Sequence, residues 1–537
     1  MDYLVFGNEN AENDELLATC YVEPPSAITG RPVLTGRWGT GKTAILIHKA
    51  LELERVMRGA RKNPRSVWLL NESTLDLAEL RGLQRLAGST RELERALEHV
   101  WKAEIVRAAC IQLADLWKHY GSPRNPHWEH VARLSTSPGV LEPLWKNAAK
   151  LAALVLRSDD DAGVLSEIQE NYRRLSLSHT SEQMQLCLED CKAWQPQPVV
   201  AIEPIDSPTS DLETEPGLAR TLIDALLNLF QAQFQPSSSQ LLNVRLSIPW
   251  HRYDVDALVS PQKVTQYLGH VTWNATQLRE FINRRIEWEF RRVQRGTTPK
   301  GGQDAWRLLF GSNVKNLVCA SRPREDSFGY VLRHTHHRAR DLQKVARMAV
   351  EADAIRANTT VDDVLRRGGQ GGRVSEHAIR EAVRKFCAEY FPIRETEAMR
   401  RFPQLRAIVH KLDSLQVPFT HAEFERRLRD LPEPPASDAL DQLWDAGLVG
   451  LEITPQDEND IQVFKDLLGD DCYRTYQLSH EHVVHKWFRF EYNSHESLMG
   501  LVRRLEGLGK ASPAFVLHPL TFETLTPRTT KEYPLGA

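Results

Sequence analysis

The sequence predicts an α/β fold in which a parallel sheet is flanked by helices, with further helical regions and a small C-terminal sheet. Three observations support this class. Short apolar runs alternate with amphipathic stretches, a glycine-rich turn directly follows the first apolar run, and the C-terminal third has the pattern of helices followed by a hairpin. The chain has 537 residues, which is enough for about three or four domains.

The composition excludes several classes of protein. Hydrophobic residues make up 41% of the chain and charged residues 26%, which is the ordinary range for globular proteins. The 68 Lys and Arg residues nearly balance 71 Asp and Glu, which argues against a surface that coats nucleic acid throughout. Seven cysteines without a C-x-x-C pair indicate a reducing, cytoplasmic location. No apolar run reaches the length of a membrane span and no secretory signal is apparent, so no membrane association is expected.

The first predicted elements are a strand, a loop and a helix. Residues 31–35 form a short apolar run, and from Thr43 apolar residues recur at helical spacing through about Met57. A second strand is predicted at 66–71. Residues 74–193 beyond it are predicted to be helical, and one helix there begins with a capping box formed by Ser89 and Glu92.

Two further strands are predicted at 199–202 and 241–248, with a strongly apolar helix at 217–234 between them. Strands that alternate with helices in this way predict a parallel sheet covered on both faces. The basic stretch 284–295 contains interleaved glutamates, so we expect it to be a solvated helix face.

The C-terminal third begins after a glycine-rich segment, 367–373, which is the best candidate for a linker. Helices are predicted to about Leu431, including one that a capping box opens at Thr420. A helix at 437–446 is then followed by strands at 448–453 and around 473–487. Helices followed by a small hairpin predict a winged-helix-like domain.

One motif carries a specific chemistry. The pattern G-x-x-x-x-G-K-[ST] is met at every fixed position by Gly36, Arg37, Trp38, Gly39, Thr40, Gly41, Lys42 and Thr43. Glycines let backbone N–H groups wrap around phosphates, and the helix that follows directs its positive end at them. Lys42 can then reach the terminal phosphates, and the Thr43 hydroxyl can ligate Mg²⁺. The motif predicts nucleotide binding, and ATP is the default because the N-K-x-D pattern that reads guanine is absent.

A second carboxylate-bearing element is needed to hold the metal and orient the attacking nucleophile. Glu203 and Asp206 are the best candidates, since they follow the most apolar run after the loop. A surface loop after a buried strand is the alternative interpretation. Glu72, directly after the second strand, is a weaker candidate.

Two arginines are candidates for contact with the terminal phosphate. Arg338 and Arg340 stand in the first turn of a predicted helix, where a cation works against the helix dipole unless an anion lies nearby. Their contact with bound nucleotide is one interpretation, and a solvated arginine pair is the other.

Several stretches of the chain resemble bacterial STAND- and KAP-like P-loop ATPases. The resemblance rests on residues 6–14, the phosphate loop, Arg252-x-Asp254-Val255, residues 333–342 and Phe515-Val516-Leu517-His518-Pro519. It implies an arginine-bearing helical lid, a winged-helix region and a nucleotide-controlled switch, in some members a phage-defence component beside a separate effector.

The same resemblance implies that Lys42 and Thr43 contact phosphate and Mg²⁺, that Glu203 is the metal-site acid and that Arg340 is the lid arginine. Two departures from the family pattern put efficient hydrolysis in question. Pro204 follows Glu203 where a second acid is usual, and Ala339 replaces the usual proline before the lid arginine.

From these features we expect four regions. Residues 1–73 and 195–290 would form the P-loop NTPase core, 74–194 a helical insertion, 291–366 a helical lid, and 374–537 a helical and winged-helix-like domain. The first functional hypothesis is a slowly hydrolysing ATP switch that works with a protein effector or by self-oligomerisation. The alternatives are an ATPase that binds DNA through its winged helix, and a protein that binds ATP without hydrolysing it.

Overall fold

The computed structural model describes residues 4–24, 30–57, 67–71, 77–120, 125–136, 177–192, 199–205, 212, 215–234, 242–249, 266–294, 304–315, 324–431, 434–453, 487–490, 497–507, 513–525 and 528–529. The chain divides into two compact units. The sheet unit comprises Glu23–Trp38 and Lys42–Val271, and the helical unit comprises Met1–Val22, Gly39–Gly41 and Thr272–Ala537. The four regions expected from the sequence remain a prediction.

The sheet unit is built on five parallel strands in the order β2-β3-β4-β1-β5. They are β1 (Val33–Gly36), β2 (Val67–Asn71), β3 (Val199–Glu203), β4 (Asn243–Pro249) and β5 (Leu268–His270). The parallel sheet predicted from the sequence is confirmed. The strand β5 was not predicted, because its three residues carry no alternating apolar pattern.

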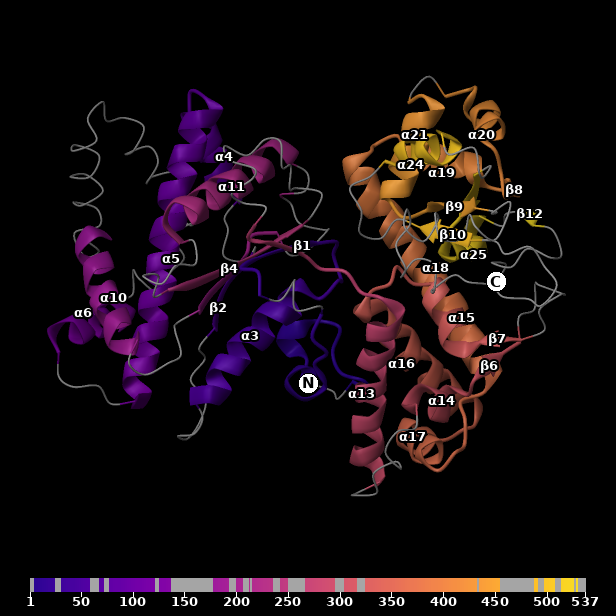
Figure 1. Cartoon of the computed structure of the whole chain (residues 1–537), viewed down its shortest axis with the longest axis horizontal. Coiled ribbons are helices and arrows are strands. Elements are labelled where there is room, and N and C mark those ends of the chain that lie inside the picture. The colour runs from indigo at the N-terminus through magenta and orange to yellow at the C-terminus, as the bar shows by residue number, and fades with distance from the viewer. Residues whose placement is uncertain are drawn as a thin grey trace. The chain divides into compact units, whose positions relative to one another are not determined.

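Helices cover this sheet, with α3 on one side and α11 on the other (Figure 1). The helices of the unit are α3 (Lys42–Met57), α4 (Leu77–Leu86), α5 (Thr90–Tyr120), α6 (Pro126–Thr136), α10 (Leu177–Lys192) and α11 (Pro216–Leu229), which continues as the π-helix η5 (Phe230–Phe234). Thus the described residues of 74–193 are helical apart from the turn at 87–89 and Asn125, which precedes α6. Ser89 caps α5 by accepting from the Glu92 backbone N–H at 3.3 Å, but the Glu92 carboxylate accepts from the Gly88 N–H instead of closing the capping box.

The strands of the sheet unit have near-continuous apolar burial. All five residues of β3 are buried, and Val33 on β1 stands in register with Leu246 on β4. Burial on both faces explains why these strands are mainly apolar in sequence. The Trp101 indole of α5 joins this core and donates to the Leu222 carbonyl of α11 at 3.1 Å.

The helical unit gathers the N-terminal segment and the C-terminal half of the chain. Its first helices are η1 (Ala11–Asn13), α1 (Leu17–Cys20), α13 (Ala275–Gln294), α14 (Ala305–Phe310), α15 (Ser327–Arg333), α16 (Ala339–Arg356), α17 (Val361–Gly369) and α18 (Glu376–Arg401). A two-residue ladder pairs β6 (Asn313–Val314) with β7 (Glu325–Asp326).

The basic face of α13 is solvated only in part. Arg284 and Arg291 are exposed and each pairs with a glutamate four residues earlier, as expected, but other charged residues of the helix are buried. Arg285 is 2% exposed and pairs with Asp14 at 2.5 Å, and Glu289 is fully buried and accepts from the Phe6 backbone N–H at 2.8 Å. The charges of α13 therefore hold the N-terminal segment. A buried charge needs a partner, and here the partner comes from a part of the chain that is distant in sequence.

The glycine-rich segment 367–373 is a packed turn, not the linker expected from the sequence. Gly368 is the penultimate residue of α17, and a Cβ there would lie 2.6 Å from Leu309 Cδ1. Gly371 has φ +92°, and α18 begins soon after with Ser375 as its cap. The glycines thus allow close packing and a tight reversal.

The remaining described elements are further helices, a small antiparallel sheet and short terminal pieces. They are α19 (Leu405–Leu412), β8 (Gln416–Val417), α20 (His421–Leu428), α21 (Ala436–Asp445), β9 (Val449–Ile453), β10 (Trp487–Phe490), α24 (Leu498–Gly507), β11 (Ala514–Leu517), η8 (Pro519–Thr521), α25 (Phe522–Leu525) and β12 (Arg528–Thr529). The strands β10, β9 and β11 form the sheet, while β12 pairs with β8. The predicted capping box of Thr420 and Glu423 is present, and residues 473–486 of the second predicted strand lie outside the described residues.

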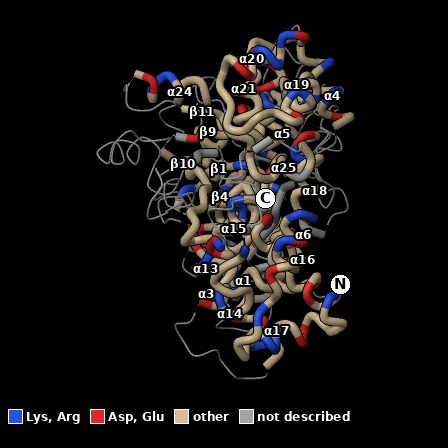
Figure 2. The backbone as a smooth tube through the Cα atoms, turned by 90° about the vertical axis from the view of Figure 1, so that its right-hand side faces the viewer, with Lys and Arg blue, Asp and Glu red and all other residues tan. Residues whose placement is uncertain are grey.

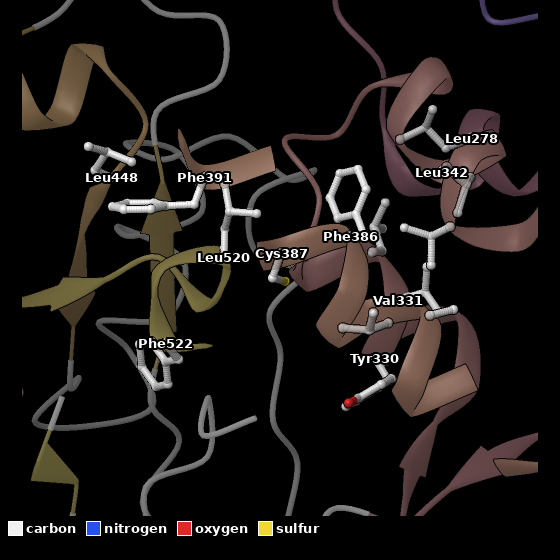
Figure 3. Packing of buried hydrophobic residues seen from close by; sticks show 14 of the residues in the cluster. Leu278, Tyr330, Val331, Leu342, Phe386, Cys387, Phe391, Leu448, Leu520 and Phe522 are labelled. Atoms are coloured by element: carbon white, nitrogen blue, oxygen red, sulfur yellow. The ribbon is translucent and has the colours of Figure 1, made fainter. Parts of the chain in front are cut away.

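Helix α18 runs through the apolar core of the helical unit. Figure 3 shows Phe386 on the side of Val331 and Leu342, and Phe391 on the side of Leu448 and Leu520. One helix therefore contacts both α16 and the C-terminal elements η8 and α25. Along the described helices, basic and acidic residues are interspersed (Figure 2). None of the helices in the described ranges has the length and apolar character needed to cross a bilayer.

Candidate nucleotide-binding site

The phosphate-binding motif lies between β1 and α3, where the sequence predicted it. Lys42 is the first residue of α3, and its Nζ donates to the carbonyl oxygens of Gly36 at 3.0 Å and Arg37 at 3.2 Å. The lysine is 4% exposed, so the loop folds around its own cation. This arrangement holds the ammonium group against two carbonyl oxygens of the loop.

The tip of the loop has the backbone conformation that glycine permits. Gly39 has φ +79° and Gly41 φ +88°, and a Cβ at Gly41 would meet only Trp273, 3.9 Å away. The Trp273 indole N–H donates to the Thr40 carbonyl at 2.7 Å, which fixes the tip within the helical unit. Open, glycine-lined backbone of this kind is what a phosphate group needs in order to approach the amides.

A hydroxyl and a carboxylate meet at the ends of the strands. Thr43 Oγ1 donates to Glu203 Oε2 at 2.6 Å, and Ser247 Oγ donates to Glu203 Oε1 at 2.6 Å. Glu203 is the last residue of β3 and is 3% exposed, while Ser247 on the neighbouring β4 is fully buried. The strand order brings the three oxygens together, because β4 lies between β1 and β3.

Ser247 is a site residue that the sequence reasoning missed. Its only signal is a small hydroxyl inside an otherwise apolar part of strand β4, and that signal has meaning only once the strand order is known. Asp206, the second predicted acid, lies outside the described residues, as do Arg252 and Asp254. Trp273 was also missed, because a tryptophan after a strand has many structural explanations.

The two predicted arginines differ in burial. A Cβ at Gly39 would lie 3.2 Å from Arg338 Cδ and 3.9 Å from Arg340 Cδ, so both side chains pass the loop tip. Arg338 is 3% exposed and caps α16 with an extended backbone, whereas Arg340 is exposed. Their proximity to the loop was expected from the sequence. Their roles remain predictions.

Arg338 follows a buried turn of histidines. Burial lowers the pKa of His334 and of His336 well below 6.5, and it lowers the pKa of His337 to about 3. Burial also raises the pKa of Asp341, which the nearby Arg338 opposes. These imidazoles are therefore neutral at physiological pH, and Arg338 is a lasting positive charge in the turn.

Comparisons with known proteins add little to this geometry. Neither a protein-family model nor a curated protein matches the chain. Among solved structures, the Orc1 protein of Aeropyrum pernix in complex with DNA matches with a TM-score of 0.28 and 15% identity, over 92% of this chain and 90% of that one. The site is therefore argued from its own residues.

Proposed function

We propose that this protein is an ATP-binding switch that hydrolyses ATP slowly. The observation that carries the proposal is the contact at 2.6 Å between Thr43, the hydroxyl of the phosphate-binding motif, and Glu203 at the end of β3. A phosphate loop and a strand-end carboxylate are the two parts that such a nucleotide site requires. Their sequence separation of 160 residues makes an incidental pairing a poor explanation.

The residues present fit a magnesium ion accompanied by phosphates. Mg²⁺ prefers oxygen ligands, and Thr43 Oγ1, Glu203 and Ser247 supply a buried oxygen cluster beside the loop. When bound, the ion would supply positive charge to the β- and γ-phosphates. Lys42 would turn from the loop carbonyls to the phosphates, and Glu203 would hold the Thr43 hydroxyl and metal-bound water in place.

Slow turnover follows from the environment of Glu203. Both of its carboxylate oxygens already accept a hydroxyl donor, and the buried residue that follows is Pro204. The described residues 199–205 thus contain no second carboxylate next to Glu203 that could orient an attacking water. An enzyme built this way would keep ATP bound for a long time before hydrolysing it, which suits a switch.

The arginines give the switch its sensitivity to the third phosphate. Arg338 and Arg340 pass Gly39 of the loop, so phosphates cradled by the loop amides would lie within their reach. In this proposal residues 291–366 act as a helical lid and residues 374–537 as a helical and winged-helix-like output domain. The effector protein, or a second copy of the chain, that would receive the signal is part of the same proposal and is implied by the family resemblance alone.

DNA binding is the weaker function. In a helix-turn-helix arrangement α21 would be the recognition helix, since it follows α20 and precedes the sheet. Its sequence, ASDALDQLWD, contains three aspartates and no Lys or Arg. A helix of that charge repels phosphates, so the geometry favours a protein-directed switch.

The test compares two lysines of the same helix. Lys42→Ala should abolish binding of Mg·ATP, because it removes the phosphate cation, while the far-ultraviolet circular dichroism stays unchanged. Lys49→Ala removes a lysine that pairs with the half-exposed Glu23, away from the loop carbonyls that Lys42 contacts, and should bind Mg·ATP as the wild type does. Calorimetric titration measures both affinities. Equal ATP affinity of Lys42→Ala and the wild type would refute the proposed function.

A further inference from the structure

Arg338 is a buried cation that has only part of its hydrogen bonds satisfied. Its Nη1 donates to the Tyr390 hydroxyl at 2.7 Å. Its Nη2 is also buried and has no hydrogen-bond partner in the described part of the chain. A buried, charged donor without an acceptor is costly, so the arrangement suits an anionic ligand.

The guanidinium lies beside the loop in which such an anion would bind. A Cβ placed on Gly39 would be 3.8 Å from Arg338 Nη1 and 3.2 Å from Cδ. The side chain therefore passes directly from the cap of α16 along the loop tip. A Cβ at position 39 would crowd this side chain, and the positive φ of +79° independently favours glycine at a position that the phosphate-binding motif leaves open.

Tyr390 is held rigidly where it meets the arginine. Its ring stacks on Phe386, one turn earlier on α18, with centroids 4.9 Å apart and planes inclined by 18°. Phe386 is itself fully buried in the core of the helical unit (Figure 3). The ring of His336 lies 6.1 Å away on another side. The hydroxyl thus has a fixed position, set by packing and independent of any ligand.

We propose that Tyr390 is the positioning residue of Arg338, and that it directs Nη2 to the terminal phosphate of ATP. By accepting from Nη1, the hydroxyl fixes the plane of the guanidinium, which is rigid and carries its donors in a fixed fork. The remaining amino group then faces a phosphate oxygen present in ATP and absent from ADP. This inference rests on the proposed function, because it requires that the loop bind a nucleotide.

The position of Tyr390 also says where the signal would go. Helix α18 packs against α16 and, further along, against η8, α25 and α19. Arg394, one turn after Tyr390, donates to the Ala446 carbonyl at 3.1 Å, at the turn that leads into β9. Next to the arginine, His336 bonds the Gly447 carbonyl at 3.0 Å and stacks on His518. Both contacts reach the turn just before β9, so movement of Arg338 would be felt at that one turn through two separate routes.

The test is the removal of one oxygen atom. Tyr390→Phe keeps the ring that stacks on Phe386 and deletes the hydroxyl that accepts from Arg338. The matched control is Tyr330→Phe, because Tyr330 is also buried in the helical unit but its hydroxyl points away from the labelled side chains of Figure 3. The full-length proteins are titrated calorimetrically with a non-hydrolysable ATP analogue and with ADP, both in the presence of Mg²⁺.

We expect Tyr390→Phe to lower the ratio of ATP-analogue to ADP affinity by roughly tenfold, the scale of one charge-assisted hydrogen bond. ADP affinity should stay at the wild-type value, while thermal stability should fall, because the buried Arg338 Nη1 loses its acceptor. Nucleotide affinities of Tyr330→Phe should stay at wild-type values. In an Arg338→Ala background, the change Tyr390→Phe should have no further effect on the ratio, because the two residues act as a unit.

Two outcomes would overturn the inference. One is an unchanged affinity ratio in Tyr390→Phe, and the other is an equal loss of affinity for both nucleotides, which reports a merely structural role. Either result leaves nucleotide binding by the loop intact. Failure of the wild-type protein to bind either nucleotide would instead refute the proposed function itself.

Discussion

At the scale of single residues, Glu203 has the most consequential position. It accepts a hydrogen bond on each carboxylate oxygen, from Thr43 and from Ser247, and it is buried. An amide in its place could still accept from one hydroxyl and donate to the other, so the local structure would persist. The same amide is a poor partner for a metal-bound water and has no basic character.

We therefore predict that Glu203→Gln binds Mg·ATP with nearly wild-type affinity and loses about 100-fold or more of its hydrolysis rate. Single-turnover hydrolysis of labelled ATP measures the rate, and calorimetry measures the affinity. The control is Glu23→Gln, an exposed acid of the same unit that pairs with Lys49. Wild-type hydrolysis by Glu203→Gln would assign the acid's role to another residue, with Asp206 the next candidate.

Residues of the site could be predicted only where a local pattern encodes them. Lys42 and Thr43 follow from a motif of fixed spacing, and Glu203 follows from its place after an apolar strand. Ser247 could not be found in this way, because its partner lies on a neighbouring strand and the strand order is a long-range property. Likewise the burial of Arg285 depends on Asp14, which lies 271 residues away.

At the scale of elements, two helical glycines provide a matched comparison. A Cβ at Gly368 in α17 would lie 2.6 Å from Leu309 Cδ1 and 3.3 Å from Phe290, whereas a Cβ at Gly217 in α11 would meet nothing within 4 Å. Alanine favours a helix over glycine by about 1 kcal/mol, but overpacking a core costs about 1–3 kcal/mol.

Gly217→Ala should therefore stabilise the protein by up to about 1 kcal/mol, while Gly368→Ala should destabilise it by about 1–2 kcal/mol. Urea unfolding followed by tryptophan fluorescence measures both changes. Stabilisation by both substitutions would mean that position 368 is an open linker after all, as its glycine-rich sequence first indicated.

A second element, the buried turn at 334–337 together with His518, makes the helical unit sensitive to acid. Burial holds the pKa of His337 and of His518 at about 3, and it depresses the pKa of His334 and His336 as well. Below pH 6.5 these histidines bind protons in the unfolded chain but stay neutral in the folded chain. The stability present above that pH is therefore lost as the pH falls.

For each histidine that stays neutral in the folded chain, the free energy of unfolding should fall by about 2 kcal/mol between pH 6.5 and about pH 5. The raised pKa of Asp341 acts in the opposite sense and offsets part of this loss. Urea midpoints measured across this range test the prediction. His518→Gln keeps a side-chain acceptor for the Leu520 N–H. It should reduce the slope of the free energy of unfolding against pH by the contribution of about one proton. A profile that the substitution leaves unchanged would show that His518 titrates normally.

Elements with local signals were predictable, and those without were not. The capping box at Thr420 and Glu423 and the alternation of strands with helices both appear as expected. The short strands β5 and β11 exist because neighbouring strands offer hydrogen-bonding edges, which no window of sequence records. The turn at 367–373 was mistaken for a linker because close packing and flexibility both favour glycine.

At the scale of the whole molecule, the chain's beginning is tied to its second half. The Gly7 carbonyl accepts from Gln343 of α16 at 2.7 Å, and the Phe6 N–H donates to Glu289 of α13. Residues 39–41 of the loop also group with this helical unit. One helix, α16, therefore adjoins the N-terminal segment at Gln343 and the loop tip at its Arg338 cap, and it is the element in which a response to nucleotide should be seen.

The last prediction follows from this placement. Residues 333–347 should exchange amide hydrogens more slowly with ATP bound than with ADP bound, because a ligand biases a conformation only through a differential contact. A charge-assisted hydrogen bond of ~1.5–3 kcal/mol corresponds to about a ten- to hundredfold difference in that equilibrium. Arg338→Ala should erase the difference, and Arg340→Ala should only narrow it, since water screens the exposed Arg340. Arg356→Ala, at the far end of α16, is the control and should keep it. Equal protection by ATP and ADP in the wild type would identify a static nucleotide binder.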